Sequence, residues 1–290
     1  MNIKDIKNLF LRFWRSDNTK IALLRDVLIA FVAVLVVLII LWSYTGQWFA
    51  APMVAIESGS MEHDNPPPPF GRLGTIDAGD MVLVQKVFKQ SDLVTYGTAK
   101  NANDTNSFFY GNWGDVIIYK PLGRTDVSQI IHRCMCWVDV DDNNGKLTYS
   151  IEEFNIHNVS LSTLTSELQK NGLIPNYPYI FPEPWTNSGY LTKGDHNNVI
   201  DQATDICPQP VKLEWISGKG RSEIPWVGTI NLFFEDVTNG HLSDSQSTVK
   251  NVHQDSLICL AILIAILVSI PISLDLYDYF KHKEKRKQQQ

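Results

Sequence analysis

The residues with the clearest chemical potential are one serine, one histidine and two aspartates. Ser60 belongs to Ser58-Gly59-Ser60-Met61, a glycine-containing turn that can present a hydroxyl to solvent. A serine hydroxyl is a weak nucleophile at neutral pH and needs a neighbouring base, usually a histidine that a carboxylate orients. His132 lies in an alternating apolar run, and Asp195 and Asp201 lie in a turn-rich segment further along the chain. These residues predict nucleophilic chemistry at a carbonyl if the fold brings them together.

Each of these residues also has a purely structural interpretation. Ser-Gly-Ser and Gly-Asp segments are common in ordinary turns, and a single histidine in a strand usually belongs to the packing. His63, three residues after Ser60, is a rival base by its position in the chain, although a loop histidine is the simpler interpretation. His196 follows Asp195, where we expect an exposed turn residue. Taken one at a time, the residues leave catalysis open.

The cysteines raise the question of a metal or a disulfide. Cys134, Cys136 and Cys207 lie between two apolar segments, and an odd number of cysteines there allows one disulfide at most. Cys134 and Cys136 would share a strand face with His132 and could join His196 and Cys207 in a metal cluster. The Cys-x-Cys spacing is unusual for a zinc pair, and small buried side chains explain it well. We therefore expect neither a metal site nor a cofactor.

Short β-rich runs separated by turn residues must position these candidates. Two strands are expected after Gly-Asp turns, at Met81–Val87 and Val116–Tyr119. A third run, Gln129–Val140, alternates so that His132, Cys134 and Cys136 share one face. The other expected elements are a hairpin tip at Asp142–Gly145, a helix at Ser160–Asn171, strands at Tyr190–Thr192, Lys212–Ile216 and Trp226–Phe234, and a polar tether at residues 235–255.

Two segments are long and apolar enough to cross a bilayer. Residues 27–47 and 256–274 contain no Asp, Glu, Lys or Arg, and about 20 apolar residues span the hydrocarbon core. The first segment is longer than the apolar core of a signal peptide and has 26 residues before it. Only a basic tail follows the second segment. We therefore expect two membrane anchors and exclude a purely soluble protein.

The charge distribution predicts the orientation of these anchors, because Lys and Arg near a span favour the cytoplasmic side. Residues 1–26 carry six basic and three acidic side chains, and residues 275–290 carry five and three. Residues 48–255 carry 14 basic and 25 acidic side chains. We expect a multi-pass protein of the cell membrane with both termini cytoplasmic and residues 48–255 forming a β-rich domain on the outer face. The acidity of this domain excludes nucleic acid as an expected partner.

Four of these segments, taken in order, resemble the motifs of the type I signal peptidases. Where bacterial members have a lysine base, this chain has His132, which is similar to archaeal members and to the catalytic subunit of the eukaryotic signal peptidase complex. A later stretch, Gly218–Gly228, resembles another motif of that branch, and the resemblance extends over residues 25–275 with interruptions. The four segments are Ser58–Met61, Gly114–Ile117, Ile131–Arg133 and Lys193–Asp201.

The resemblance implies a mainly β fold, with an antiparallel signal-peptidase-like catalytic domain between an N-terminal and a C-terminal transmembrane helix. It implies Ser60 as the nucleophile, His132 as general base and then acid, and Asp201 as the carboxylate that orients it. Asp195 matches a second acidic position, and the sequence does not choose firmly between the two aspartates. The hydroxyl of Ser58 and the backbone N–H of Ser60 would form the oxyanion hole.

The implied activity is that of a membrane-bound serine endopeptidase that removes N-terminal signal peptides from exported preproteins, without metal or cofactor. Its expected partners are the signal peptides of secretory preproteins, the lipid bilayer and, less directly, the protein-export channel. Small substrate residues at positions −1 and −3 would fit shallow apolar pockets. We suggest Val54, Ile56 and Val82 as the side chains that line them.

Departures from the family's pattern keep other functions open. His63 stands where the family usually has proline, and the tetraproline Pro66–Pro69 follows it, which leaves the path after the nucleophile open. Insertions are expected near residues 64–78, 95–112 and 155–189. The chain could instead be a catalytically silent or narrow-specificity homologue, or a membrane-anchored extracytoplasmic binding or adhesion domain. In that last case Ser60 and His132 would lie far apart.

Overall fold

The structure is a computed structural model that describes residues 5, 11–16, 18–63, 67–176, 181, 183–242 and 244–288, with the backbone alone for Asp278 and residues 282–288. The chain divides into two compact units, Met1–Pro52 and Met53–Gln290. The expected tetraproline lies partly outside the described residues, as do parts of the insertion at 155–189 and of both basic terminal segments.

The first unit contains a long apolar helix, α2 (Thr19–Thr45). Asn18 begins the helix by accepting a hydrogen bond from the Lys20 backbone N–H, and Gly46, at φ +69°, ends it. The helix is long and apolar enough to cross a membrane, and its apolar side chains are exposed. Aromatic rings gather at its C-terminal end, as they do at membrane interfaces, and these rings are Trp42, Trp48 and Phe49.

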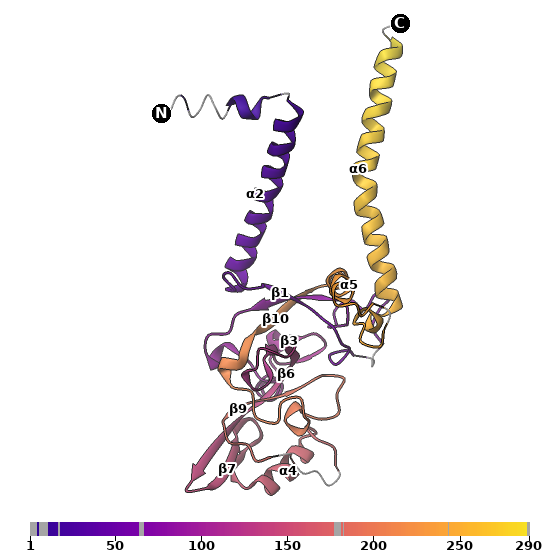
Figure 1. The fold of residues 1–290 in the computed structure, drawn as a ribbon. Coiled ribbons are helices and arrows are strands. Elements are labelled where there is room, and N and C mark those ends of the chain that lie inside the picture. The colour runs from indigo at the N-terminus through magenta and orange to yellow at the C-terminus, as the bar shows by residue number, and fades with distance from the viewer. Residues whose placement is uncertain are drawn as a thin grey trace. The chain divides into compact units, whose positions relative to one another are not determined.

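The second unit is built on an antiparallel sheet of eight strands (Figure 1). The strands follow the order β1-β2-β10-β5-β6-β7-β8, and β9 pairs with β6. A small separate sheet contains β3 and β4. The expectation of a largely antiparallel β domain is confirmed, and a signal-peptidase-like fold stays a prediction. The bounds are β1 Met53–Ala55, β2 Met81–Gln85, β3 Phe108–Phe109, β4 Asn112–Trp113, β5 Val116–Tyr119, β6 Ile130–Asn143, β7 Lys146–Ile151, β8 Ile156–Val159, β9 Gly189–Lys193 and β10 Ile216–Ile224.

β6 joins the parts of this sheet, because it pairs with β5 at its start, with β9 in its middle and with β7 at its end. The register with β9 shifts between Cys134 and Cys136, and a bulge of this kind turns the following side chains to the other face. Cys134 therefore packs in one core cluster with Cys207, whereas Cys136 packs in another with Trp185. The expectation that Cys134 and Cys136 share one face is wrong.

Several local predictions are confirmed. The hairpin between β6 and β7 turns at Asn144-Gly145, since Asn143 pairs with Lys146. Helix α4 (Leu161–Lys170) begins after Ser160, whose hydroxyl accepts the Thr163 N–H, and it buries Leu164 and Leu168. Gly79 and Gly114 have φ of +96° and +83° in the turns before β2 and β5, a conformation that glycine adopts without steric cost.

Other local predictions differ from the structure. The segment 95–112, expected as an insertion, contains helix α3 (Tyr96–Ala102), which the Thr95 hydroxyl caps. The expected strand at Trp226–Phe234 is helix α5 (Gly228–Asn239), and the expected strand at Lys212–Ile216 is a 3₁₀ turn, η6 (Leu213–Trp215), before β10. The expected tether is packed, because Asp236 accepts hydrogen bonds from Ser247, Thr248 and Val249.

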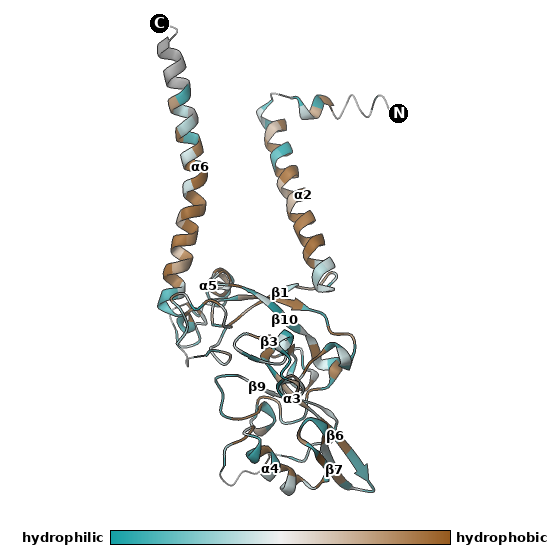
Figure 2. Ribbon diagram, turned by 180° about the vertical axis from the view of Figure 1, so that it is seen from behind, coloured by the Kyte–Doolittle hydropathy of each residue, from teal (hydrophilic) through white to brown (hydrophobic). Residues whose placement is uncertain are grey.

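The second unit ends in the long helix α6 (Gln254–Gln288), which extends beyond the expected span of 256–274. Its stretch Gln254–Lys281 is long and apolar enough to cross a membrane. Figure 2 shows the apolar residues along the middle of α6 and, separately, of α2. Pro271 lies inside the helix, which membrane helices tolerate. Two such helices are consistent with the expected membrane localisation.

Candidate active site

Ser60, His132 and Asp201 form one chain of hydrogen bonds. Ser60 Oγ lies 3.0 Å from His132 Nε2, and His132 Nδ1 lies 2.7 Å from Asp201 Oδ2. Ser60 is half-buried, whereas His132 and Asp201 are 3% and 1% exposed. An ionised carboxylate only accepts, so Nδ1–H donates to Asp201 and leaves Nε2 to accept the serine hydroxyl proton. The arrangement has the geometry of a serine nucleophile with its base and an orienting carboxylate.

Asp201 is held by neutral donors on the same oxygen that faces His132. The Tyr119 hydroxyl donates to Oδ2 at 2.8 Å and the Thr192 hydroxyl at 2.7 Å. Burial, together with the charge of Asp201, raises the pKa of Tyr119 well above its usual range, so this hydroxyl stays a donor. These donors position the carboxylate without cancelling its charge, and that charge stabilises His132 when it carries a proton.

Adjacent strands and one 3₁₀ turn bring these side chains together. Ile117 on β5 lies opposite His132 on β6, and Tyr119 lies two residues further along β5. β9 supplies Thr192, and the short turn η5 (Asp201–Ala203) begins at the aspartate. Antiparallel pairing fixes the register of each strand. His132, Asp201 and the two supporting hydroxyls are therefore held by regular secondary structure.

Gly194 lets the loop after β9 pass close to the serine. A Cβ at this position would lie 2.5 Å from the Ser60 backbone oxygen and 2.9 Å from His132 Nε2. Any larger residue would push this loop away from the serine, which explains why glycine stands here. Two residues later the backbone N–H of His196 donates to the Ser60 oxygen at 3.0 Å, and the His196 residue is exposed as expected. The loop thus holds the turn Ser58–Met61, called the serine turn below, through contacts with the Ser60 main chain.

A second charged cluster uses the neighbouring residue on β6. Arg133 is fully buried and donates to Asp195 and to the backbone carbonyls of residues 109–110 and 112–114. His63 Nε2 lies 2.8 Å from Asp195 Oδ2. Burial acts to raise the pKa of Asp195, but the hydrogen bonds from Arg133 and His63 outweigh it, and the pKa is lowered. Asp195 therefore pairs with Arg133 and His63, while Asp201 is the carboxylate at His132.

Ser58, the expected oxyanion donor, lies beside Ser60. Ser58 Oγ lies 3.5 Å from Ser60 Oγ, and Ser58 is exposed. A hydroxyl at this place could donate to an oxyanion that forms on a substrate bound to Ser60. Its part in an oxyanion hole stays a prediction.

The three suggested pocket residues lie near the serine turn but differ in exposure. Val54 on β1 is half-buried, whereas Ile56 and Val82 are 2% and 0% exposed. Ile56 and Val82 pack with Met61, the residue after Ser60, in one core cluster. This cluster supports the turn from the sheet side. That these side chains also line substrate pockets stays a prediction.

All four cysteines are free, and Cys134, Cys136 and Cys207 are buried. Burial raises the pKa of each of these three thiols, which keeps them neutral and unreactive. The buried packing agrees with the simpler interpretation of the Cys-x-Cys pair.

Three parts of this site were not predicted from the sequence: the hydroxyls of Tyr119 and Thr192 and the role of Arg133. A tyrosine and a threonine in apolar strands carry no sign of a polar partner, because both are common strand residues. Arg133 did give a signal, since a charged residue in the middle of an apolar run needs a buried counter-charge. That signal would have linked Arg133 to a nearby carboxylate.

No model of a known protein family matches the chain, and no curated protein matches it. The resemblance to signal peptidases therefore stays a prediction from the four ordered motifs.

Proposed function

We propose that the protein is a membrane-bound serine endopeptidase that removes N-terminal signal peptides from exported preproteins. The observation that carries this proposal is the contact of 3.0 Å between Ser60 Oγ and His132 Nε2, with Asp201 at the other ring nitrogen. These residues are far apart in the sequence and come from the motifs that resemble the signal peptidases. A binding or adhesion domain gives no reason for this contact.

The geometry supports a two-step hydrolysis. Ser60 Oγ attacks the carbonyl carbon of the scissile bond while His132 Nε2 takes the hydroxyl proton. The C–N bond then breaks, and His132 gives this proton to the amine of the departing mature protein. A water molecule attacks the acyl group on Ser60, its proton passes to His132, and the free carboxyl end of the signal peptide leaves. The proton on His132 returns to Ser60 Oγ.

Asp201 acts throughout by holding His132 in one tautomer and by stabilising its charged form. His132 must be neutral to accept the serine proton, because a protonated ring has no free lone pair. No metal or cofactor enters these steps.

The two apolar helices support a task at the membrane surface. The apolar core of a signal peptide lies in the bilayer, and its cleavage site emerges a few residues outside. Ser60 follows the end of α2 by a short stretch of chain, so the substrate would not have to leave the membrane. The excess of Lys and Arg in both terminal segments supports cytoplasmic termini and a catalytic domain on the outer face.

β1 offers a place for an extended substrate. It stands at one end of the sheet order, and an edge strand has backbone groups that can pair with an added peptide. Val54 belongs to this strand, and Ser60 follows five residues after its end at Ala55. A peptide paired with β1 would run towards the serine turn.

The test is cleavage of a preprotein by the full chain reconstituted in lipid vesicles. The test preprotein carries Ala at positions −3 and −1, and a matched version carries Phe at −1. We expect a single new product that begins at position +1 with the first substrate and little product with the second. Absence of cleavage, or equal cleavage by the Ser60→Ala variant, would contradict the proposal.

A further inference from the structure

The segment that leads into α6 contacts the region around Ser60 at several points. Asn251 Nδ2 donates to the Glu57 carbonyl at 2.8 Å, and Asp255 accepts the Gly71 N–H at 2.9 Å. His253 Nε2 lies 3.0 Å from Glu62 Oε1. Glu57 and Glu62 stand three residues before and two residues after Ser60. Asn251 and His253, directly before α6, are therefore bonded to both sides of the serine turn.

Glu62 transmits this contact to the turn itself. Its backbone N–H donates to the Gly59 carbonyl at 3.1 Å, and its carboxylate folds against Gly59 so closely that a Cβ there would overlap it. The intervening Met61 is 1% exposed and packs in the core cluster beneath the turn. A movement of the Glu62 carboxylate would therefore move the main chain that carries Ser60.

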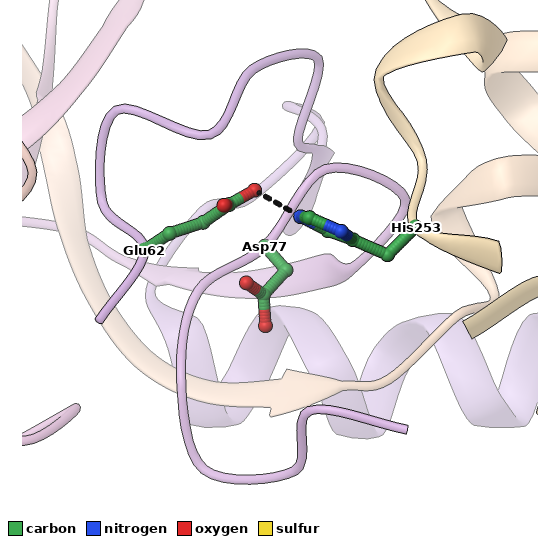
Figure 3. Close-up of side chains that lie close together, drawn as sticks. All are labelled: Glu62, Asp77 and His253. Atoms are coloured by element: carbon green, nitrogen blue, oxygen red, sulfur yellow. Dashed lines mark hydrogen bonds and ion pairs between the residues drawn. The ribbon is translucent and has the colours of Figure 1, made fainter. Parts of the chain in front are cut away.

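A nearby guanidinium holds the other side of this carboxylate. Arg72 lies 3.4 Å from Glu62 Oε2 and 2.8 Å from Asp77 Oδ1. Figure 3 shows Glu62 and His253 in contact beside Asp77. Glu62, Asp77 and His253 offer ligand atoms within 4.8 Å of one another. Arg72 already supplies the positive charge to both carboxylates, so an ion-pair network explains the cluster better than a metal ion.

Apolar packing also holds the segment 251–255 against the turn before β2. Gly79 has φ +96°, and a Cβ there would lie 2.9 Å from Val252. Val252 is 7% exposed, and it stands directly before His253. The segment 251–255 is thus fixed by packing as well as by hydrogen bonds, and His253 has a defined place from which to hold Glu62.

We propose that His253 is a positioning residue for Ser60, and that it acts by holding the Glu62 carboxylate against the serine turn. The C-terminal helix α6 is then part of the catalytic unit as well as a membrane anchor. A carboxylate only accepts hydrogen bonds, so the His253 ring donates through Nε2–H. Loss of this donor leaves Glu62 held by Arg72 alone and loosens the turn. The inference rests on the proposed peptidase function.

The first test compares kinetic constants of the reconstituted full chain. We expect His253→Ala to lower kcat about fivefold, less than one full charge-assisted hydrogen bond because Arg72 still holds Glu62, with KM unchanged because His253 does not touch the substrate. His253→Gln keeps an N–H donor and should stay within about twofold of wild type. The matched control is His157→Ala, which removes another histidine–glutamate pair, to Glu152 at 3.3 Å. Unchanged kcat in His253→Ala, or equal losses in His253→Ala and His157→Ala, would overturn the inference.

A second test does not need a substrate. In a Ser60→Cys background the thiol would lie beside His132, which promotes the reactive thiolate, and iodoacetamide alkylation of Cys at position 60 is followed by peptide mass spectrometry. We expect His253→Ala to slow this alkylation severalfold and His253→Gln to restore it. Equal rates in all three proteins would overturn the inference. If wild type cleaves no preprotein, the proposed function fails, while these rates still report whether His253 positions residue 60.

Discussion

Two histidine–aspartate pairs lie side by side in this domain, and their surroundings give them different properties. His132 pairs with Asp201, and His63 pairs with Asp195, at 2.7 Å and 2.8 Å. The adjacent β6 residues His132 and Arg133 direct their side chains to the two different aspartates. The two pairs have similar distances, and they differ in the third residue that contacts each pair, which is Ser60 for the first and Arg133 for the second.

The third group decides what each pair can do. His132 has a serine hydroxyl at its free nitrogen, and its aspartate is held by the neutral hydroxyls of Tyr119 and Thr192. Asp195 is instead compensated by the buried guanidinium of Arg133, which holds its pKa low. A carboxylate whose charge is already balanced adds little to the basicity of its histidine. We therefore expect proton transfer at the first pair and structural support from the second.

The largest difference is expected on removal of the base. His132→Ala leaves Ser60 without a proton acceptor and should lower the cleavage rate by at least about 10⁴-fold. Circular dichroism of the variant checks that the fold is kept. Cleavage within tenfold of wild type would show that His132 is not the base and would contradict the difference inferred between the two histidine–aspartate pairs.

Asp201→Asn should cost about 10³-fold in kcat, because an amide does not stabilise the charged ring and permits the wrong tautomer. Asn keeps the volume and can still accept from Tyr119 or Thr192, so thermal stability should change little. The measurement is kcat beside the thermal unfolding midpoint. A large fall in stability with intact kcat would reverse the roles assigned to the two aspartates.

Asp195→Asn should show the opposite pattern, with a loss of stability larger than the loss of activity. It leaves the buried Arg133 charge without its counter-charge, and we expect a cost of about 3 kcal/mol in the free energy of unfolding. Denaturant unfolding of detergent-solubilised protein measures this value.

The same variant makes a pH prediction. The pKa of Asp195 is lowered from its ordinary value of 3.8, so the carboxylate contributes its full stability above that pH and loses it as the pH falls through the lowered pKa. The stability gap between wild type and Asp195→Asn should be full at neutral pH and shrink below about pH 3.8. A gap that is constant with pH would contradict the ion-pair explanation.

The smallest effect is expected for His63→Ala. Arg133 still compensates Asp195, so cleavage should fall less than about threefold and stability by about 1 kcal/mol. Parallel kinetics and unfolding of this variant and wild type provide the measurement. A loss of cleavage comparable to that of His132→Ala would make His63 the base.

The sequence could identify the candidate residues but not their pairing. Asp195 and Asp201 lie in the same turn-rich segment, and either could reach a histidine on β6. The choice depends on side-chain direction in β6, where Arg133 binds Asp195 and leaves Asp201 to His132. Strand alternation separates His132 from Arg133, but the aspartate that reaches each of them depends on the path of the chain after β9, which no local pattern reveals.

The fold was predictable where local signals are strong and not where packing overrides them. The hairpin tip at Asp142–Gly145 and the helix that begins after Ser160 have strong local signals, and both predictions are confirmed. Residues 226–234 contain β-branched and aromatic side chains typical of a strand, yet they enter helix α5. Gly228 lies against the Asp80 backbone, where a Cβ would clash. This tertiary contact requires glycine at the first residue of the helix and is invisible in the sequence.

The most direct test of the central claim is preprotein cleavage by wild type, Ser60→Ala and His63→Ala, measured side by side in lipid vesicles. We expect wild type and His63→Ala to release the mature product at similar rates, and Ser60→Ala to release none. Cleavage by Ser60→Ala at the wild-type rate would contradict the account, because Ser60 Oγ is the atom that His132 is positioned to activate.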